Sequence, residues 1–220
     1  ADAGATVANH GLRHTHMQRR GADETEAAWR TRLRTELVTA QERLEGEMGS
    51  APRLFAYPYG EFDPDLRALV IEQGWTGFGQ QSGPAGEHSD PAVLPRFPMT
   101  GTWGKMEVFP EKVRSLPLPV LEAEPLDPRL DPDDQSVRRP VLRLKLADTG
   151  KPWQQVTAYA SNQGPADVQW EDTPDPWLRV QARDLLLRGR SRYNVTVASQ
   201  WPGRWYWYSH TWIVGEEHEN

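Results

Sequence analysis

The segment RLFAYPYGEFDPDLRALVIEQGWTGFGQQ, residues 53–81, decides the class of the fold. Its first part, 53–57, is apolar and predicts a buried strand that a proline and a glycine then break. Asp63, followed at once by a proline, is a typical N-cap for a helix that Gly74 ends. Residues 76–81 predict the next strand. The segment therefore indicates a strand, a loop, a helix and a second strand in succession.

The same order of elements precedes this segment. Residues 5–9 predict a short buried strand that runs into a histidine-rich loop, 10–16. A long helix follows, with a capping box that begins at Asp23 and with Gly49 at its end. With a further strand at 93–97, the pattern indicates parallel β/α architecture, in which functional loops follow the C-terminal ends of strands. About four strands and two helices are too few to close a barrel, so we expect part of the domain to lie upstream.

The second half of the chain has a different composition. Residues 116–140 contain six prolines and a cluster of acidic residues, which is typical of an extended connector. We therefore expect a β/α domain at 1–115, a linker at 116–140 and a third region at 141–220. That region predicts a small antiparallel β-sandwich, because short alternating runs are separated by turn residues. The expected strands are 141–146, 155–161, 166–170, 177–182, 193–198 and 205–214.

Composition excludes several classes of function. The 220 residues contain 25 Lys and Arg against 31 Asp and Glu, a net charge of -6 that disfavours a broad contact with nucleic acid or an anionic membrane. No run of apolar residues is long enough to predict a transmembrane segment. The chain has no cysteine, which excludes disulfides, thiolate metal sites and a cysteine nucleophile.

The first loop contains candidate metal ligands. His10 and His14 are four residues apart, and His16 follows two residues later. If the loop turns helically after the strand, this spacing places the first two imidazoles close enough to share a divalent metal ion. A polar loop without a metal has the same sequence pattern, and only the position at a strand end favours the metal site.

The second loop, residues 55–61, combines a turn-forming proline and glycine with two tyrosines. Backbone N–H groups in such a turn can point at a developing oxyanion. The alternative is an ordinary strand-to-helix turn in which the aromatic rings pack against neighbours. The sequence of this loop alone leaves both interpretations open.

Together the two loops resemble a known family. Residues 7–14 (VANHGLRH) are similar to the His-x-x-x-His motif of polysaccharide deacetylases of the NodB-homology type, carbohydrate esterase family 4. Residues 55–60 (FAYPYG) are similar to the next motif of that family, in the form found in its biofilm poly-N-acetylglucosamine deacetylase branch. The strand at 76–81 and the Leu-Pro-Arg segment at 94–96 also fit. The resemblance covers about residues 1–115.

The resemblance implies a distorted β/α barrel that hydrolyses N-acetyl groups from an amino-sugar polymer. In this family two histidines and an aspartate hold zinc or a similar divalent metal, and a second aspartate is the general base. By resemblance, His10 and His14 are the two histidine ligands, and the backbone N–H of Tyr59 helps to hold the oxyanion. Tyr57 and Pro58 are the expected substrate-binding residues of the same loop.

This chain departs from the family pattern in three ways. The Phe-Asp-Asp motif that supplies both aspartates is not found before His10, and Asp63 is better explained as a helix cap. Ala56 stands where many members have arginine. The late histidine that acts as general acid has no clear match, and His88 is the candidate. We therefore expect a C-terminal part of a longer deacetylase whose missing N-terminal part supplies the aspartates, so that these residues alone are inactive. The resemblance also favours a periplasmic or extracellular location.

Aromatic residues gather near the C-terminus. Seven of the ten tryptophans follow residue 150, and Trp205 and Trp207 are expected on one face of the last strand. This face is either a platform for sugar rings of the polymer or a packing surface. The main functional alternative is a non-catalytic carbohydrate-binding or scaffold protein on a degenerate deacetylase fold. Fold alone also leaves open another sugar-processing enzyme.

Overall fold

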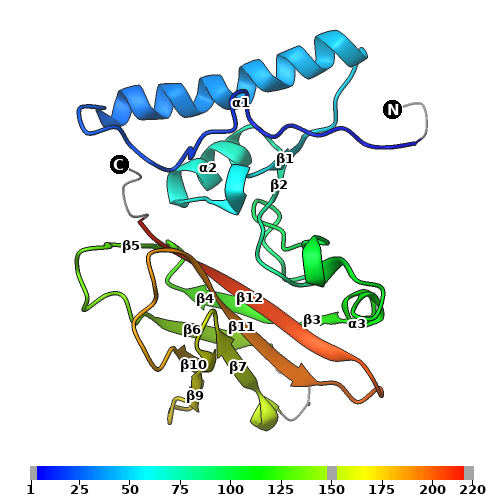
Figure 1. Cartoon of the computed structure of the whole chain (residues 1–220), viewed down its shortest axis with the longest axis vertical. Helices are drawn as coiled ribbons and strands as arrows, with labels where there is room; N and C mark the ends of the chain where they lie inside the picture. The colour runs from blue at the N-terminus through cyan, green and yellow to red at the C-terminus, as the bar shows by residue number, and fades with distance from the viewer. Residues whose placement is uncertain (1–3, 148–152, 216–220) are drawn as a thin grey trace. The chain divides into compact units, whose positions relative to one another are not determined.

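The computed structural model describes residues 4–147 and 153–215 (Figure 1). The chain divides into two compact units by its internal contacts. The first comprises Ala1–Gln80 with Asp90–Leu94, and the second comprises Gln81–Ser89 with Pro95–Asn220. Residues 95–115, which the sequence assigned to the β/α domain, thus group with the second unit.

The first unit begins with the predicted long helix, α1 (Glu26–Met48). Its N-cap is Thr25, whose side chain accepts a hydrogen bond from Ala28 N, and not the predicted Asp23. Gly49 ends the helix in the left-handed conformation at a φ of 76°, as the sequence indicated. The buried residues of α1 form one stripe, which consists of Trp29, Leu33, Glu36, Leu37, Ala40 and Gln41.

Two short parallel strands, β1 (Leu54–Ala56) and β2 (Thr76–Phe78), form the sheet of this unit. Single bridges extend it on both sides, from Asn9 to β1 and from β2 to Leu94. The expected strand at 5–9 is thus reduced to one bridge, and no closed barrel is found among the described residues. The mixed α/β class is confirmed, whereas the barrel is not shown.

Helix α2 (Pro64–Glu72) connects the two strands and begins as predicted. The Asp63 carboxylate accepts a hydrogen bond from Leu66 N at 2.8 Å, which caps the helix. At Gly77 in β2 an added Cβ would lie 1.9 Å from the carbonyl oxygen of Ala92. Only glycine permits this close approach. The core of the unit contains Met17, Trp29, Leu33, Leu37, Phe55, Tyr57, Leu66, Leu69, Val70, Trp75, Ala92 and Val93.

The second unit contains two sheets. The smaller consists of β4 (Val120–Glu124), β6 (Val141–Leu146), β10 (Leu178–Gln181) and β9 (Asp167–Trp170), in that order. The larger consists of β3 (Leu116–Pro117), β12 (Trp205–Val214), β11 (Gly189–Ala198), β7 (Thr157–Ala160) and β8 (Gly164–Pro165), and β5 (Arg129–Leu130) also pairs with β12. The unit also has a short helix, α3 (Phe109–Arg114), and 3-10 turns η2 (Gly101–Gly104) and η3 (Trp153–Gln155).

Both sheets contribute to one hydrophobic core. Alternate residues of β6 and β10 are fully buried, as are Val195 of β11 and Trp212 of β12. This period of two is what the sequence predicted for a sandwich. The expectation of a wholly antiparallel architecture is wrong in one respect, because β3 and β5 pair with β12 in parallel.

The proline-rich segment 116–140 is not a simple connector. It supplies β3, β4 and β5, and the side chains of Leu118 and Val120 lie in the core of the second unit. Its prolines are compatible with these strands because only Pro117 lies within one, at the end of the two-residue strand β3. The composition of the segment is thus typical of a linker, but its apolar residues Leu118 and Val120 pack into the core of the second unit.

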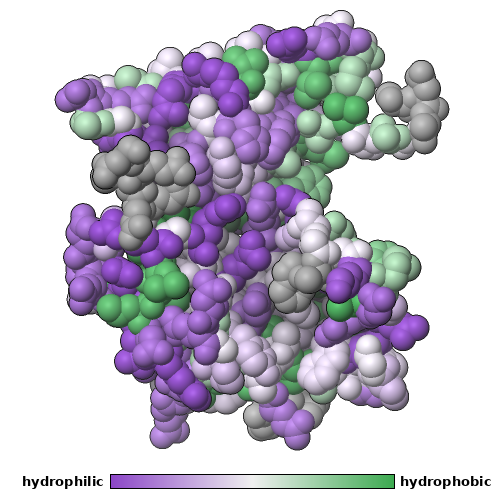
Figure 2. Space-filling model, in the orientation of Figure 1, coloured by the Kyte–Doolittle hydropathy of each residue, from purple (hydrophilic) through white to green (hydrophobic). Residues whose placement is uncertain are grey.

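The surface agrees with the polar composition of the chain. Over α1 the space-filling view is mostly hydrophilic, in keeping with a helix that buries one stripe (Figure 2). No helix in the described part of the chain has the length and apolar character needed to cross a bilayer.

Candidate functional site

The position of the histidine loop is fixed by Asn9. Its backbone N–H donates to Leu54 O at 3.1 Å, and its own carbonyl accepts from Ala56 N at 2.9 Å. The buried side chain donates from Nδ2 to Leu37 O of α1 at 2.8 Å. His10 therefore follows directly on the edge of the small sheet, beside the end of β1, as the sequence predicted for a loop at a strand end.

His10 and His14 lie next to each other, with ring centroids 4.7 Å apart and ring planes inclined by 71°. Nδ1 of His10 is 2.7 Å from the carbonyl oxygen of Ala56. A carbonyl can only accept, so Nδ1 carries the proton and donates, and the lone pair of the neutral ring is on Nε2. A backbone carbonyl holding one ring nitrogen is the usual partner of a metal-binding imidazole. The pair therefore fits a divalent metal as two of its ligands.

The second loop meets this pair. Tyr59, in the 3-10 turn η1 (Pro58–Gly60), has a left-handed backbone at a φ of 58°. Its ring lies edge-on to His14 at 4.6 Å and is stacked on His16 at 3.9 Å, with the planes only 6° apart. Non-glycine residues rarely adopt this conformation, and those that do are found preferentially at functional sites. The structure thus brings together the two loops that the sequence singled out separately.

A carboxylate that sequence reasoning passed over orients His16. Nδ1 of His16 lies 2.7 Å from Oε2 of Glu61, and the same oxygen accepts from Nε2 of Gln18 at 2.6 Å. The Glu61 side chain is 1% exposed. The one signal in the sequence was that Glu61 directly follows the turn glycine. Its burial, which only the structure shows, means that the carboxylate needs hydrogen-bond donors. His16 is hydrogen-bonded to Glu61 and stacked on Tyr59, so it contributes to fixing the position of the Tyr59 ring.

A third ligand completing a metal site is not found in this region. Within residues 4–147 and 153–215, no group of three histidine, aspartate or glutamate side chains is arranged to hold a metal. The His10 and His14 pair therefore accounts for two donors. A structural zinc site has four ligands and a catalytic one has three plus water, so two imidazoles are fewer protein ligands than either kind of site uses.

Tyr57 and Pro58, the expected substrate-binding residues, are both buried. Tyr57 is 0% exposed and its hydroxyl donates to Ala92 O at 2.8 Å. Burial raises the pKa of this phenol far above its ordinary range. The expectation of substrate contact is therefore corrected for Tyr57, whose apolar ring is more stable in the core than in water. Tyr57 directly precedes the turn that contains Tyr59, and Pro58 is the first residue of that turn.

His88, the candidate general acid, is exposed in a turn of the second unit. The turn is closed by Ser89, whose Oγ accepts from Gly86 N at 2.9 Å. Its catalytic role stays a prediction.

The two tryptophans of the predicted platform differ in environment. Trp205, at the start of β12, is 41% exposed. Trp207 is half-buried, with its ring edge-on to Phe97 at 5.4 Å and its Nε1 donating to Ser209 Oγ at 3.1 Å. Tyr206, between them, faces the core and is 7% exposed. Packing thus involves Trp207, while Trp205 keeps a broad exposed surface.

Comparison with known proteins agrees with these loops. Residues 1–78 match the family model for polysaccharide deacetylase. A family 4 carbohydrate esterase from Streptomyces lividans, solved in complex with acetate, is 32% identical with a TM-score of 0.32, covering 37% of this chain and 38% of that one. The deacetylase domain of BpsB from Bordetella bronchiseptica is 27% identical with a TM-score of 0.32, covering 33% and 28%.

These matches are partial. The chain spans less than two-fifths of the length of either solved structure, and no curated protein matches it. The family match covers both the histidine loop and the turn at Tyr59. Residues 1–78 are therefore similar in sequence to the polysaccharide deacetylase family.

Proposed function

We propose that this chain is part of a metal-dependent hydrolase that removes N-acetyl groups from an amino-sugar polysaccharide, and that it is nearest the poly-N-acetylglucosamine branch of the family. The observation that supports this most is the meeting of His10, His14 and the Tyr59 turn in one place. Two imidazoles and a turn of backbone amides are among the parts that amide hydrolysis at a metal uses.

In this proposal His10 and His14 are two ligands of a divalent metal, with zinc preferred because imidazole suits it. When bound, the metal polarises the acetamide carbonyl and lowers the pKa of a water molecule. His10 presents Nε2 because its Nδ1–H is held by Ala56 O. His14 reaches the same place from the other end of the loop.

Tyr59 is the proposed source of a backbone N–H for the developing oxyanion. Its position is supported by the stack on His16, which Glu61 in turn holds. Such preorganised donors contribute most when they do not have to move during the reaction. We further propose His88 as the general acid and Trp205 as a contact for the polymer, since both side chains are exposed.

Zinc titration of the protein by calorimetry tests the ligand assignment, with the His10→Ala and His14→Ala double variant as control. We expect saturable binding in the unchanged protein and its loss in the variant. Equal binding by both would overturn the metal site. Acetate release from N-acetylglucosamine oligomers, measured with the whole gene product that contains these residues, tests the activity.

A non-catalytic carbohydrate-binding protein is the second candidate, and the exposed ring of Trp205 is the observation that favours it. Aromatic faces stack on the apolar faces of sugar rings without any metal. This candidate predicts oligosaccharide binding that Trp205→Ala weakens, together with no acetate release from the whole gene product. Acetate release that depends on His10 and His14 would reject it.

A further inference from the structure

Glu36 places a carboxylate in the buried stripe of α1. Its neighbours in that stripe include Trp29, Leu33 and Leu37, all at most 2% exposed, and the Glu36 side chain is itself 1% exposed. An ionised carboxylate in such a place is costly unless donors surround it. An apolar side chain would fill this buried position without that cost, so the donors that reach Glu36 indicate what the carboxylate does there.

Those donors all come from the histidine loop. Oε2 of Glu36 accepts from the backbone N–H groups of Leu12 and Arg13, each at 3.0 Å. The guanidinium of Arg13 also donates, from Nε to Oε1 of the same carboxylate. Two successive backbone N–H groups directed at one anionic oxygen form a concave anion-binding turn. In this protein a side chain of α1 occupies that turn.

The residue before this turn is held as well. Gly11 has a φ of 77°, and its N–H donates to Oδ1 of Asn9 at 2.9 Å. Consecutive amides of residues 11–13 are therefore all bound, by Asn9 and Glu36 between them. His10 and His14 lie immediately on either side of these three residues. The separation between the two imidazoles thus depends on a loop whose backbone is fixed from α1.

We propose that Glu36 is a positioning residue that holds residues 11–13 so that His10 and His14 bind one metal ion together. This rests on the proposed metal site. The φ of 54° at His14 supports it, because a non-glycine residue keeps a left-handed conformation only where its surroundings enforce it. Groups that hold metal ligands in place in this way change metal affinity when they are removed.

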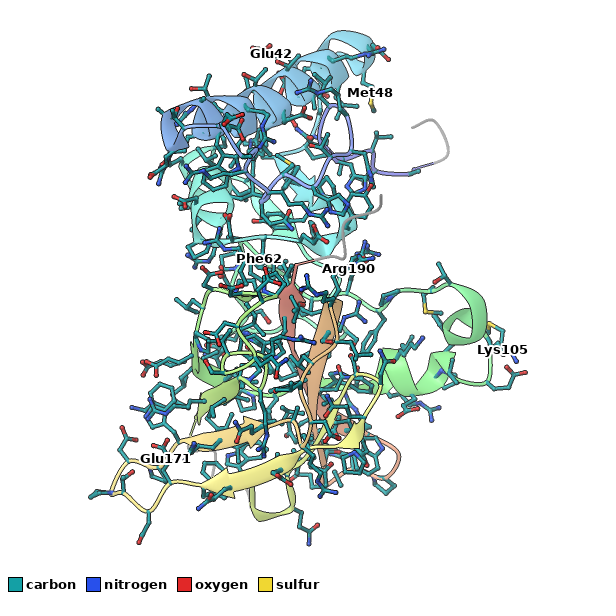
Figure 3. All side chains as sticks on the ribbon, turned by 60° about the vertical axis from the view of Figure 1, so that its left-hand side comes forward. Glu42, Met48, Phe62, Lys105, Glu171 and Arg190 are labelled. Carbon is teal, nitrogen blue, oxygen red and sulfur yellow. The ribbon has the colours of Figure 1, made fainter. Side chains whose placement is uncertain are left out.

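The decisive variant is Glu36→Gln, which keeps the shape of the side chain and replaces one acceptor oxygen by a donor. Glu42→Gln is the matched control, because Glu42 is exposed on the outer side of the same helix (Figure 3). Both are titrated with zinc alone by calorimetry, after circular dichroism has shown that they are folded. We expect about a tenfold or greater rise in Kd for Glu36→Gln and none for Glu42→Gln.

Arg13→Ala separates the two kinds of bond. It removes the ion pair, whose guanidinium partner is 61% exposed, and leaves both backbone bonds to Glu36. We expect its zinc affinity to change by less than about threefold, because the two backbone bonds that hold residues 12 and 13 to Glu36 remain in this variant. A loss as large as that of Glu36→Gln would overturn the backbone-holding role.

Gly11→Ala tests the loop without altering the core of α1, which matters if Glu36→Gln fails to fold. The added Cβ has space, with its nearest contact at 3.5 Å, but the φ of 77° disfavours alanine. We expect zinc binding to weaken severalfold. Unchanged zinc affinity in folded Glu36→Gln or in Gly11→Ala would overturn this inference alone. Failure of the unchanged protein to bind zinc better than the His10 and His14 double variant would instead overturn the proposed metal site.

Discussion

His210 makes the stability of the second unit dependent on pH. It lies on β12 opposite Tyr193 of β11, and its ring is 4.5 Å from that of Trp212. Among the described residues, neither Nε2 of His210 nor Nε1 of Trp212 has a hydrogen-bond partner, and both atoms are buried. Burial without a counter-charge lowers the pKa of His210 to about 4. The imidazole is therefore neutral in the folded protein over most of the working pH range.

The sign and size of the effect follow from the two pKa values. In the unfolded chain an ordinary histidine has a pKa of about 6.5. As pH falls from about 6.5 to 4 the unfolded state binds a proton that the folded state excludes, so the free energy of unfolding decreases. A difference of about 2.5 pKa units corresponds to about 3 kcal/mol, of which about 2 kcal/mol is lost by pH 5. That is a large part of the stability of a typical domain.

Urea unfolding at about pH 7.5 and pH 5, followed by tryptophan fluorescence, measures this loss. His210→Phe keeps an aromatic ring and removes the titrating group. We expect the decrease in unfolding free energy between the two pH values to be about 2 kcal/mol smaller in this variant than in the unchanged protein. His88→Gln is the control, since His88 is exposed.

Comparing the decrease in unfolding free energy between the two pH values in the three proteins removes the contribution of other titrating groups. Carboxylates titrate equally in all three proteins, so only the difference between them reports on His210. If the unchanged protein and His210→Phe lose the same stability on acidification, His210 is not a buried neutral imidazole and the argument from its unpartnered Nε2 fails.

Three further predictions concern the free energy of unfolding. Gly77→Ala should destabilise the first unit by about 3 kcal/mol or more in thermal unfolding, because the added methyl would meet the carbonyl of Ala92, and an unchanged midpoint would contradict that close approach. Tyr206→Ala should lower the free energy of unfolding in urea by about 3–5 kcal/mol, whereas Trp205→Ala should lower it by less than about 1 kcal/mol. A similar loss in both variants would contradict the difference in burial between the two rings. Asp63→Ala should remove the cap of α2 at a cost of about 1–2 kcal/mol, and no loss would mean that another group replaces it.

Local signals predicted the secondary structure well where one pattern dominates. The run of β12 was expected at 205–214 and is observed at the same residues, because aromatic and β-branched side chains, which favour strands, make up most of it. Helix α2 begins at its Asp-Pro cap as expected. At α1 two acceptable caps compete, and Thr25 rather than Asp23 is used, since the choice depends on how the preceding loop enters the helix.

The segment 116–140 shows where local reasoning fails. Its prolines and acids predicted a connector, yet it supplies three strands, because pairing partners far along the chain decide whether a short run becomes a strand. The site divides in the same way. His10 and His14 could be chosen from spacing, whereas the bonds from Glu61 to His16 and from Glu36 to residues 12 and 13 join positions that are 45, 24 and 23 residues apart.

The sequence by itself singled out the two loops as candidates, because a histidine pair and a Pro-Tyr-Gly turn can be recognised from neighbouring residues alone. Only the tertiary structure decided what each side chain does there. It placed Tyr57 in the core, Tyr59 against two imidazoles and Glu36 beneath the histidine loop. The physical reason is that burial and hydrogen-bond satisfaction are properties of surroundings, which distant segments supply.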